Sequence, residues 1–223
     1  MAMASRESRK DGEATRIRIL EAAGELLATL GFAETSNKAV AAKAEVDLAS
    51  INYHFGSRSG LYQAVLGEAR RRFLDIADLQ RIIQAEQPAP DKLLALTELV
   101  VRKASRGRES WHLRVLAAEA LAPSSHGQEV LHPQKALKLT LLKQLFSEIT
   151  GIPADDPTLV PCILSVTAPW AMLLIGPRGG SGALRDILDM PGEVLTAQLY
   201  SFTLAGLREV GRQYQLRATA ADS

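Results

Sequence analysis

The chain has 223 residues, a formal net charge of +1 and 47% hydrophobic residues, a globular balance with ample material for a core. The near-neutral charge neither supports nor excludes a nucleic-acid partner, because a basic face can lie within a neutral total. A single cysteine, Cys162, excludes an internal disulfide and a cysteine-based zinc site, so we expect a reducing cytoplasm.

The chain is expected to begin with a polar arm and one long helix. Residues 1–12 are polar and charged and predict a disordered arm. From Glu13, apolar residues recur every three or four positions, the spacing of a helix with one buried face. Gly31 is expected to end this helix.

Two short helices are predicted next. Thr35 or Ser36 can cap a helix over 37–44, and after a tight connection a third helix runs from about 48 to 55. Two short helices joined by a three- or four-residue turn, with another packed across them, describe a helix-turn-helix.

Further along, the pattern predicts helices only. Gly56 should stop the third helix, and Ser57 should cap a fourth, which we expect to run unbroken over 58–84. The apolar stretch 158–176 could be taken for a membrane span, but two prolines interrupt it, which favours a buried helix. No segment alternates as a strand would, so the predicted class is all-α. The later helices are expected at 91–105, 110–122, 127–150, 156–176, 181–189 and 192–214.

The third helix is expected to present a polar face. At about 100° per residue, Leu48, Ile51 and Phe55 form one buried stripe. The alternative to a DNA-reading helix is an ordinary solvated surface helix, in which Tyr53 and His54 cover the hydrophobic side of a neighbouring element. Ala49, Ser50 and Tyr53 are expected to point outward, with Asn52 and His54 on the flanks.

Residues 14–66 resemble the DNA-binding domain of the TetR family of bacterial transcriptional regulators. The similarity covers the Gly-Phe stop, the Thr-Ser start of the second helix and the ending Tyr-His-Phe-Gly-Ser-Arg. The stretch SINYHFGSRSGLY is similar to the CecR-like branch, as are residues 110–124 and 151–166. The resemblance implies an N-terminal three-helix helix-turn-helix domain (13–57), a connecting helix (58–84) and a larger helical effector-binding and dimerisation domain (85–223).

The resemblance also implies which residues contact DNA. By position, Asn37 and Lys38 would lie near phosphates, and Arg58 would make a further phosphate contact. The remaining implied contacts, to bases and backbone, are Ser50, Asn52, Tyr53 and His54.

Two residues depart from the family pattern. Glu45 replaces the usual turn glycine, so the turn must avoid a positive φ or tolerate it at some cost. Asp47 replaces a usual Ser, Thr or Asn; it is a good N-cap but sets a negative charge beside the phosphates.

The sequence shows no pattern of catalytic or metal-binding residues. The four histidines do not share metal-ligand spacing on one helix. His112 and Glu119 lie two turns apart on one face and could form a ligand pair; the alternative is a satisfied, partly buried histidine. Residues 176–182 are glycine-rich but lack the strand and the Lys-Ser/Thr of a phosphate loop. We therefore expect no enzyme activity, no metal and no cofactor.

The C-terminal helices predict a dimer. Helices 156–176 and 192–214 carry extended apolar surface, which could form a four-helix bundle with a second copy. Such a dimer suits a palindromic DNA operator with half-sites about 34–36 Å apart. An effector cavity, with plain core as the alternative interpretation, could be lined by Trp111, His112, Leu116, Phe146, Cys162, Trp170 and Met172.

The resulting hypothesis is a dimeric repressor, released from its operator by a small, largely apolar effector. Movement of helix 58–84 would change the spacing of the two DNA-reading helices. The alternatives are an activator of the same type, and a helical small-molecule-binding protein or enzyme that does not bind DNA.

Overall fold

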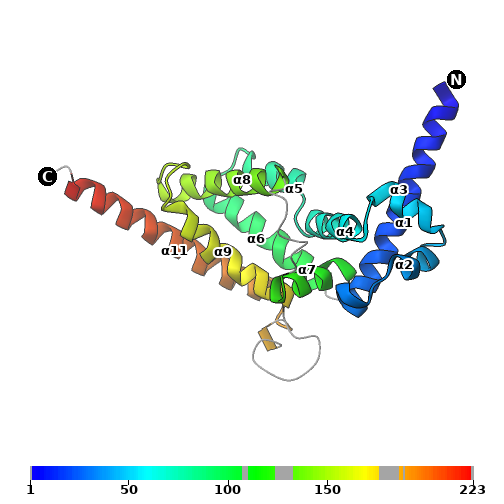
Figure 1. The fold of residues 1–223 in the computed structure, drawn as a ribbon. Helices are drawn as coiled ribbons and strands as arrows, with labels where there is room; N and C mark the ends of the chain where they lie inside the picture. The colour runs from blue at the N-terminus through cyan, green and yellow to red at the C-terminus, as the bar shows by residue number, and fades with distance from the viewer. Residues whose placement is uncertain (1, 107–109, 124–132, 176–185, 188, 222–223) are drawn as a thin grey trace. The chain divides into compact units, whose positions relative to one another are not determined.

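The computed structural model describes residues 2–106, 110–123, 133–175, 186–187 and 189–221, and within these ranges it contains helices and no strand (Figure 1). The predicted all-α class is therefore confirmed. The helices are α1 (Ala2–Glu34), α2 (Asn37–Ala44), α3 (Leu48–Phe55), α4 (Arg58–Phe73), α5 (Ile76–Ile83), α6 (Ala89–Arg106), α7 (Trp111–Leu121), α8 (Pro133–Thr150), α9 (Leu159–Ile175) and α11 (Gly192–Ala221).

The chain divides into two compact units. Unit 1 is Met1–Arg72 with Glu109–Val130, and unit 2 is Phe73–Arg108 with Leu131–Ser223. Helix α7 therefore belongs to unit 1, whereas the sequence predicted it within a separate domain over 85–223. The predicted helix 181–189 falls largely outside the described residues.

The N-terminal helix is longer than predicted. Helix α1 begins at Ala2, where we expected a disordered arm over 1–12. The segment is rich in Ala, Arg, Glu and Lys, which have high intrinsic helix propensity, and so it continues the helix that follows. Gly31, with φ of 77° and ψ of 175°, interrupts the helix at the predicted position.

The predicted connecting helix is broken into two. Helix α4 ends at Phe73 and α5 begins at Ile76, which corrects the expectation of one helix over 58–84. Asp75 explains the break, because its Oδ1 accepts a hydrogen bond from the Ala77 amide at 2.8 Å. A side chain that caps a new helix competes with continuation of the old one.

Unit 1 is held by an apolar cluster shared by α1, α2, α3, α4 and α7. Its fully covered side chains include Ile19, Val40, Ile51, Val65 and, from α7, the nearly covered Trp111. These residues come from segments far apart in the sequence, so the three N-terminal helices are packed with two further helices.

Unit 2 has its own core, in which α6 packs against α8, α9 and α11, and α5 packs against α6 and α8. Leu96, Phe146 and Leu159 are completely buried there. In the described part of the chain, no helix is both long and apolar enough to cross a membrane.

Candidate nucleic-acid interface

The third helix, α3, is fixed at both ends by local contacts. Asp47 caps its start, since Oδ1 accepts a hydrogen bond from the Ser50 amide at 2.6 Å. Gly56 ends the helix with φ of 72°, a conformation that favours glycine. Ser57 then caps α4 by accepting from the Gly60 amide at 3.0 Å. All three roles were predicted from the sequence.

Helix α3 turns most of its side chains away from the core. Ile51 is its one buried residue, and Phe55 is half-buried against the same cluster. The prediction is wrong for Leu48, whose side chain is 48% exposed. The helix is only eight residues long and its buried residue lies at its middle, so its first turn lies beyond the core.

The predicted DNA-reading residues of α3 differ in exposure. Tyr53 is 85% exposed and Asn52 is exposed, while Ser50 and His54 are half-buried. The rings of Tyr53 and His54 meet edge to face, with centroids 5.0 Å apart. The exposed polar side chains of the helix are therefore a phenol and an amide, both able to donate and accept hydrogen bonds.

Helix α2 and the turn after it complete the helix-turn-helix. Ser36, not Thr35, is the N-cap of α2, because its Oγ accepts from the Ala39 amide at 3.1 Å. At the start of α2, Asn37 is half-buried and Lys38 is exposed. Glu45 adopts φ of 54° and ψ of 48°, so the turn tolerates the left-handed conformation without a glycine.

Arg58, the third implied phosphate contact, ties the start of α4 to the end of α1. Its Nη2 donates hydrogen bonds to the carbonyl oxygens of Phe32 and, at 2.9 Å, Ala33. Its guanidinium also lies 4.4 Å from the centre of the Phe32 ring. The structure thus gives Arg58 a positioning role that the sequence did not predict; a phosphate contact by its remaining donors stays a prediction.

Helix α7 is anchored to α1 through Trp111. The indole Nε1 donates to Glu21 Oε2 at 2.7 Å, and the ring lies where a side chain at Gly24 would be. Arg72 of α4 contacts the other oxygen of Glu21 and lies 5.0 Å from the Trp111 ring centre. Sequence reasoning missed this junction; the one available signal was a glycine within the apolar stripe of α1.

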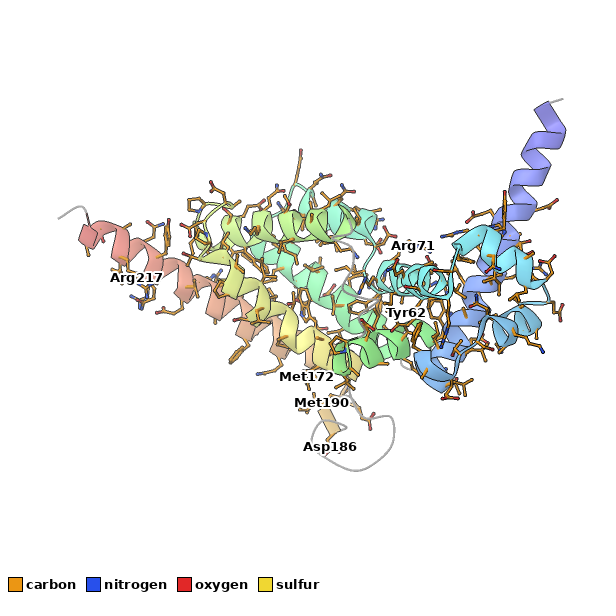
Figure 2. All side chains as sticks on the ribbon, viewed as in Figure 1. Tyr62, Arg71, Met172, Asp186, Met190 and Arg217 are labelled. Carbon is orange, nitrogen blue, oxygen red and sulfur yellow. The ribbon has the colours of Figure 1, made fainter. Side chains whose placement is uncertain are left out.

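The other end of α7 is anchored to α4. Tyr62 Oη donates to Glu119 Oε2 at 2.6 Å, and Figure 2 shows Tyr62 on α4. The Tyr62 ring also packs on Phe32, with centroids 4.8 Å apart. Two polar contacts therefore fasten α7 within unit 1.

The acids of this junction are strongly stabilised as carboxylates. Hydrogen bonds from Arg71 and then Arg72 lower the pKa of Glu68 to about 2. Partial burial of Glu21 opposes ionisation, but hydrogen bonds from Arg72 and Trp111 outweigh it and lower its pKa as well. Glu21 and Glu68 are therefore ionised at neutral pH.

The seven predicted effector-pocket residues are divided between the two units. Trp111, His112 and Leu116 lie on α7 in unit 1, whereas the other four lie in unit 2. Within unit 2, the side chain of Met172 is half exposed. The other three predicted residues, Phe146, Cys162 and Trp170, belong to the packed core.

Cys162 behaves as a core residue. Burial raises the pKa of its thiol, and Sγ lies 3.6 Å from the Thr158 carbonyl oxygen. A neutral thiol in an apolar core is a poor nucleophile.

The structure is that of a helix-turn-helix protein with an additional helical unit. A short, capped helix presents polar side chains, and a second helical unit follows. Residues 19–65 match the family model described as "Bacterial regulatory proteins, tetR family". The N-terminal domain is therefore a TetR-type helix-turn-helix domain. No curated protein matches the chain.

Solved structures with the same fold are distant in sequence. A TetR-like transcriptional regulator from Rhodococcus sp. RHA1 has 19% identity and a TM-score of 0.62, covering 86% of this chain and 95% of that one. NalD, the secondary repressor of the MexAB-OprM multidrug efflux pump in Pseudomonas aeruginosa, has 21% identity and a TM-score of 0.60, covering 88% and 96%. The similarity extends the TetR-type fold over most of the chain.

Proposed function

We propose that the chain is a DNA-binding transcription regulator that represses its target from a palindromic operator. The observation that carries this proposal is α3, where Ile51 is buried while Asn52 and Tyr53 are exposed. A helix fits the major groove, and amide and phenol groups can hydrogen-bond to base edges there. The TetR-type match over 19–65 supports the same assignment.

The contacts fall into two groups in this proposal. Asn37, Lys38 and Arg58 would hold the phosphate backbone, a sequence-independent and salt-dependent contribution. The residues that would contact bases and the adjoining backbone are Ser50, Asn52, Tyr53 and His54.

We propose that a dimer forms through α9 and α11, as the apolar surface of 156–176 and 192–214 predicts. These two helices pack together and leave large apolar side chains exposed. Phe202 is 79% exposed, an unusual position for a phenylalanine in a protein that acts as a monomer. The other exposed apolar residues of these helices include Val160, Leu164, Met172 and Val194.

We further propose that a small, largely apolar effector binds unit 2 and lowers operator affinity. A pocket of about 830 Å³ lies between α6 and the start of α11. Its lining combines apolar residues, among them Leu94, Val101 and Met190, with charged ones, among them Glu98 and Arg102. Effector binding must favour one arrangement of the dimer over another to release DNA. The core residues Phe146, Cys162 and Trp170 are candidates only if the core opens around a ligand.

The stretch SINYHFGSRSGLY supports a place in the CecR-like branch, and the proposed DNA target implies action in the cytoplasm.

The decisive experiment measures binding of the full chain to the DNA that flanks its own gene, by fluorescence anisotropy at fixed salt. Tyr53→Ala and Asn52→Ala should each weaken specific binding by about tenfold or more. Lys38→Ala should weaken binding to all sequences and reduce the dependence on salt. Arg217→Ala, a cation lost near the end of α11 in unit 2 (Figure 2), is the matched control and should change neither.

The alternatives give different results. If the folded dimer does not bind this DNA at low salt, the chain is a helical small-molecule-binding protein or an enzyme. If binding increases transcription of the adjoining gene in a purified system, the regulator is an activator.

The dimer has a separate test in analytical ultracentrifugation. Phe202→Asp should give monomers, whereas Leu121→Asp, which changes an exposed leucine of unit 1, should not. An unchanged dimer in Phe202→Asp would contradict the assigned interface.

A further inference from the structure

Unit 1 contains a pocket that the proposed DNA contacts do not use. Its volume is about 530 Å³, and it lies between the second half of α1, the end of α2 and the start of α7. All of its lining residues belong to unit 1. They are Glu25, Leu26, Thr29, Leu30, Lys43, Ser110, Trp111 and Arg114. We call it the α1–α2–α7 pocket.

Arg114 is the most informative residue of this pocket. It is half-buried, and its Nε is buried without a hydrogen-bond partner among the described residues. A guanidinium keeps its charge in proteins, so an anion that binds its other N–H groups from the pocket would stabilise this partly buried cation. The flat guanidinium matches a carboxylate in particular, because two N–H groups can face two oxygens.

The start of α7 adds to the positive potential at the same place. Ser110 occupies the N-cap position but makes no side-chain capping hydrogen bond. Its hydroxyl lies 3.3 Å from His112 Nε2 instead. The Ser110 side chain therefore does not cap α7, and the helix dipole favours negative charge beside the first turn.

A second cation also lines the pocket. Lys43 of α2 forms an ion pair with Glu25 of α1, with Nζ and Oε2 2.9 Å apart. Both side chains are about half exposed, so an anion can compete with Glu25 for Lys43. The charged residues of the lining are Glu25, Lys43 and Arg114, and together they carry a net charge of +1.

The remaining lining is apolar. Leu26, Leu30 and Trp111 form this part of the wall, and Leu30 is exposed although its side chain is large and apolar. A bare inorganic anion would leave this surface uncovered. A molecule with an apolar body and one acidic group matches both halves of the pocket.

We propose that the α1–α2–α7 pocket binds a small organic carboxylate. The carboxylate contacts Arg114, with Lys43 as the second cation, and the apolar body covers Leu26 and Leu30 beside the nearly covered Trp111. This site lies within unit 1 and is separate from the effector site proposed in unit 2. The inference does not depend on DNA binding and is tested without DNA.

The test is calorimetric titration of the full chain with naphthalene-1-carboxylate. Two further titrations use 1-naphthalenemethanol, which keeps the rings without the charge, and inorganic phosphate, which keeps a charge without the rings. The carboxylate should bind about tenfold more tightly than either one. If the folded chain does not bind it at millimolar concentration, or binds phosphate or the alcohol equally well, the proposal is wrong.

Variants locate the site. Arg114→Met should weaken binding of naphthalene-1-carboxylate about tenfold, while Arg217→Met, the same change on α11, should leave it unaltered. Glu25→Gln removes a competing acid and releases Lys43, so it should strengthen binding by about threefold. Circular dichroism checks that each variant is folded.

Arg114→Met is expected to weaken binding and Glu25→Gln to strengthen it, so a loss of folding cannot produce both results. If Arg114→Met does not fold, Glu25→Gln alone decides, because unchanged or weaker binding in that variant would contradict a site at this pocket. Equal binding by folded Arg114→Met and the unaltered chain would also contradict it.

Discussion

In each unit, one close approach between helices that are far apart in the sequence requires a glycine, and these two contacts differ in kind. In unit 1, a Cβ at Gly24 would lie 2.7 Å from Trp111 Cε2 and closer still to two other ring atoms. In unit 2, a Cβ at Gly211 would lie 2.9 Å from the Thr150 carbonyl carbon and closer still to its oxygen. In unit 1 the atoms that approach the glycine of α1 belong to a side chain, whereas in unit 2 the atoms that approach the glycine of α11 belong to the main chain.

The difference shows how each unit maintains its packing. Thr150 is buried at the end of α8, and its hydroxyl donates to the Phe146 carbonyl and accepts from the Ile152 amide. Main chain fixed in this way cannot move aside. Trp111 can rotate, and it is held against α1 by its contacts with Glu21 and Arg72. The close contact at Gly24 in unit 1 is therefore held by polar side chains, whereas the contact at Gly211 in unit 2 is held by hydrogen-bonded main chain.

The largest effect is expected for Gly211→Ala. The methyl group must displace the end of α8, and overpacking of this kind should lower the free energy of unfolding by about 3 kcal/mol. Urea unfolding, followed by Trp170 fluorescence with Trp111 replaced by Phe in every protein, measures unit 2. Gly206→Ala in the same helix is the control, since nothing lies within 4 Å of its Cβ. Equal stabilities of the two variants would refute a main-chain contact at Gly211.

Gly24→Ala should destabilise unit 1 by a smaller amount, about 2 kcal/mol, because the Trp111 ring can move away. Trp111 emission should shift to longer wavelength as the ring becomes exposed, with Trp170 replaced by Phe for this measurement. The matched control is Gly67→Ala in α4, where the Cβ meets nothing within 4 Å. That change should stabilise the helix by up to about 1 kcal/mol. An unshifted emission spectrum would contradict the contact.

The sequence predicted local features of the fold well. Ser36, Asp47, Gly56 and Ser57 act on main chain within four residues of themselves, so a short segment contains all the information needed. The break at Asp75 is equally local, but the apolar spacing through it obscured the capping signal. The all-α class follows from such signals.

The sequence could not predict contacts between distant segments. The place of α7 in unit 1 depends on Trp111 meeting Gly24 and Glu21, which no local pattern records. For the site, the helical period correctly predicted that Tyr53 is exposed. Asn52, placed on the flank, is exposed as well, whereas Ser50, placed outward, is half-buried. The helical period failed for Leu48, because periodicity gives direction and not the extent of the core.

Tyr62→Phe tests the second polar anchor of α7. It removes the hydroxyl that donates to Glu119 and should lower the stability of unit 1 by about 1 kcal/mol. Urea unfolding followed by Trp111 fluorescence measures the change. Tyr53→Phe removes a hydroxyl from the exposed face of α3 and should leave stability unaltered. If both variants lose the same stability, the Tyr62 contact is not specific.

The smallest effect concerns Glu68, whose folded-state pKa of about 2 is below its ordinary value of 4.5. A carboxyl with a lowered pKa stabilises the fold above its unfolded-state value, so this contribution is complete at neutral pH. It is lost as the pH falls from about 4.5 towards 2. Solvent reaches part of the ion pairs, so Glu68→Gln should cost less than about 1 kcal/mol at neutral pH.

The acid-unfolding curve of unit 1, followed by Trp111 fluorescence, measures this contribution. Glu68→Gln should make the stability of unit 1 less dependent on pH below 4.5, because the variant has no carboxyl to protonate at this position. Glu209 of α11 is the matched comparison. Its pKa is also lowered to about 2, by hydrogen bonds from Arg212 and Gln213, but its side chain is 54% exposed against 16% for Glu68. Solvent screens such a pair, so Glu209→Gln should leave the unfolding of unit 2 unaltered. Equal responses of the two units would mean that local pairing alone, and not the junction of α1, α4 and α7, sets the acid sensitivity.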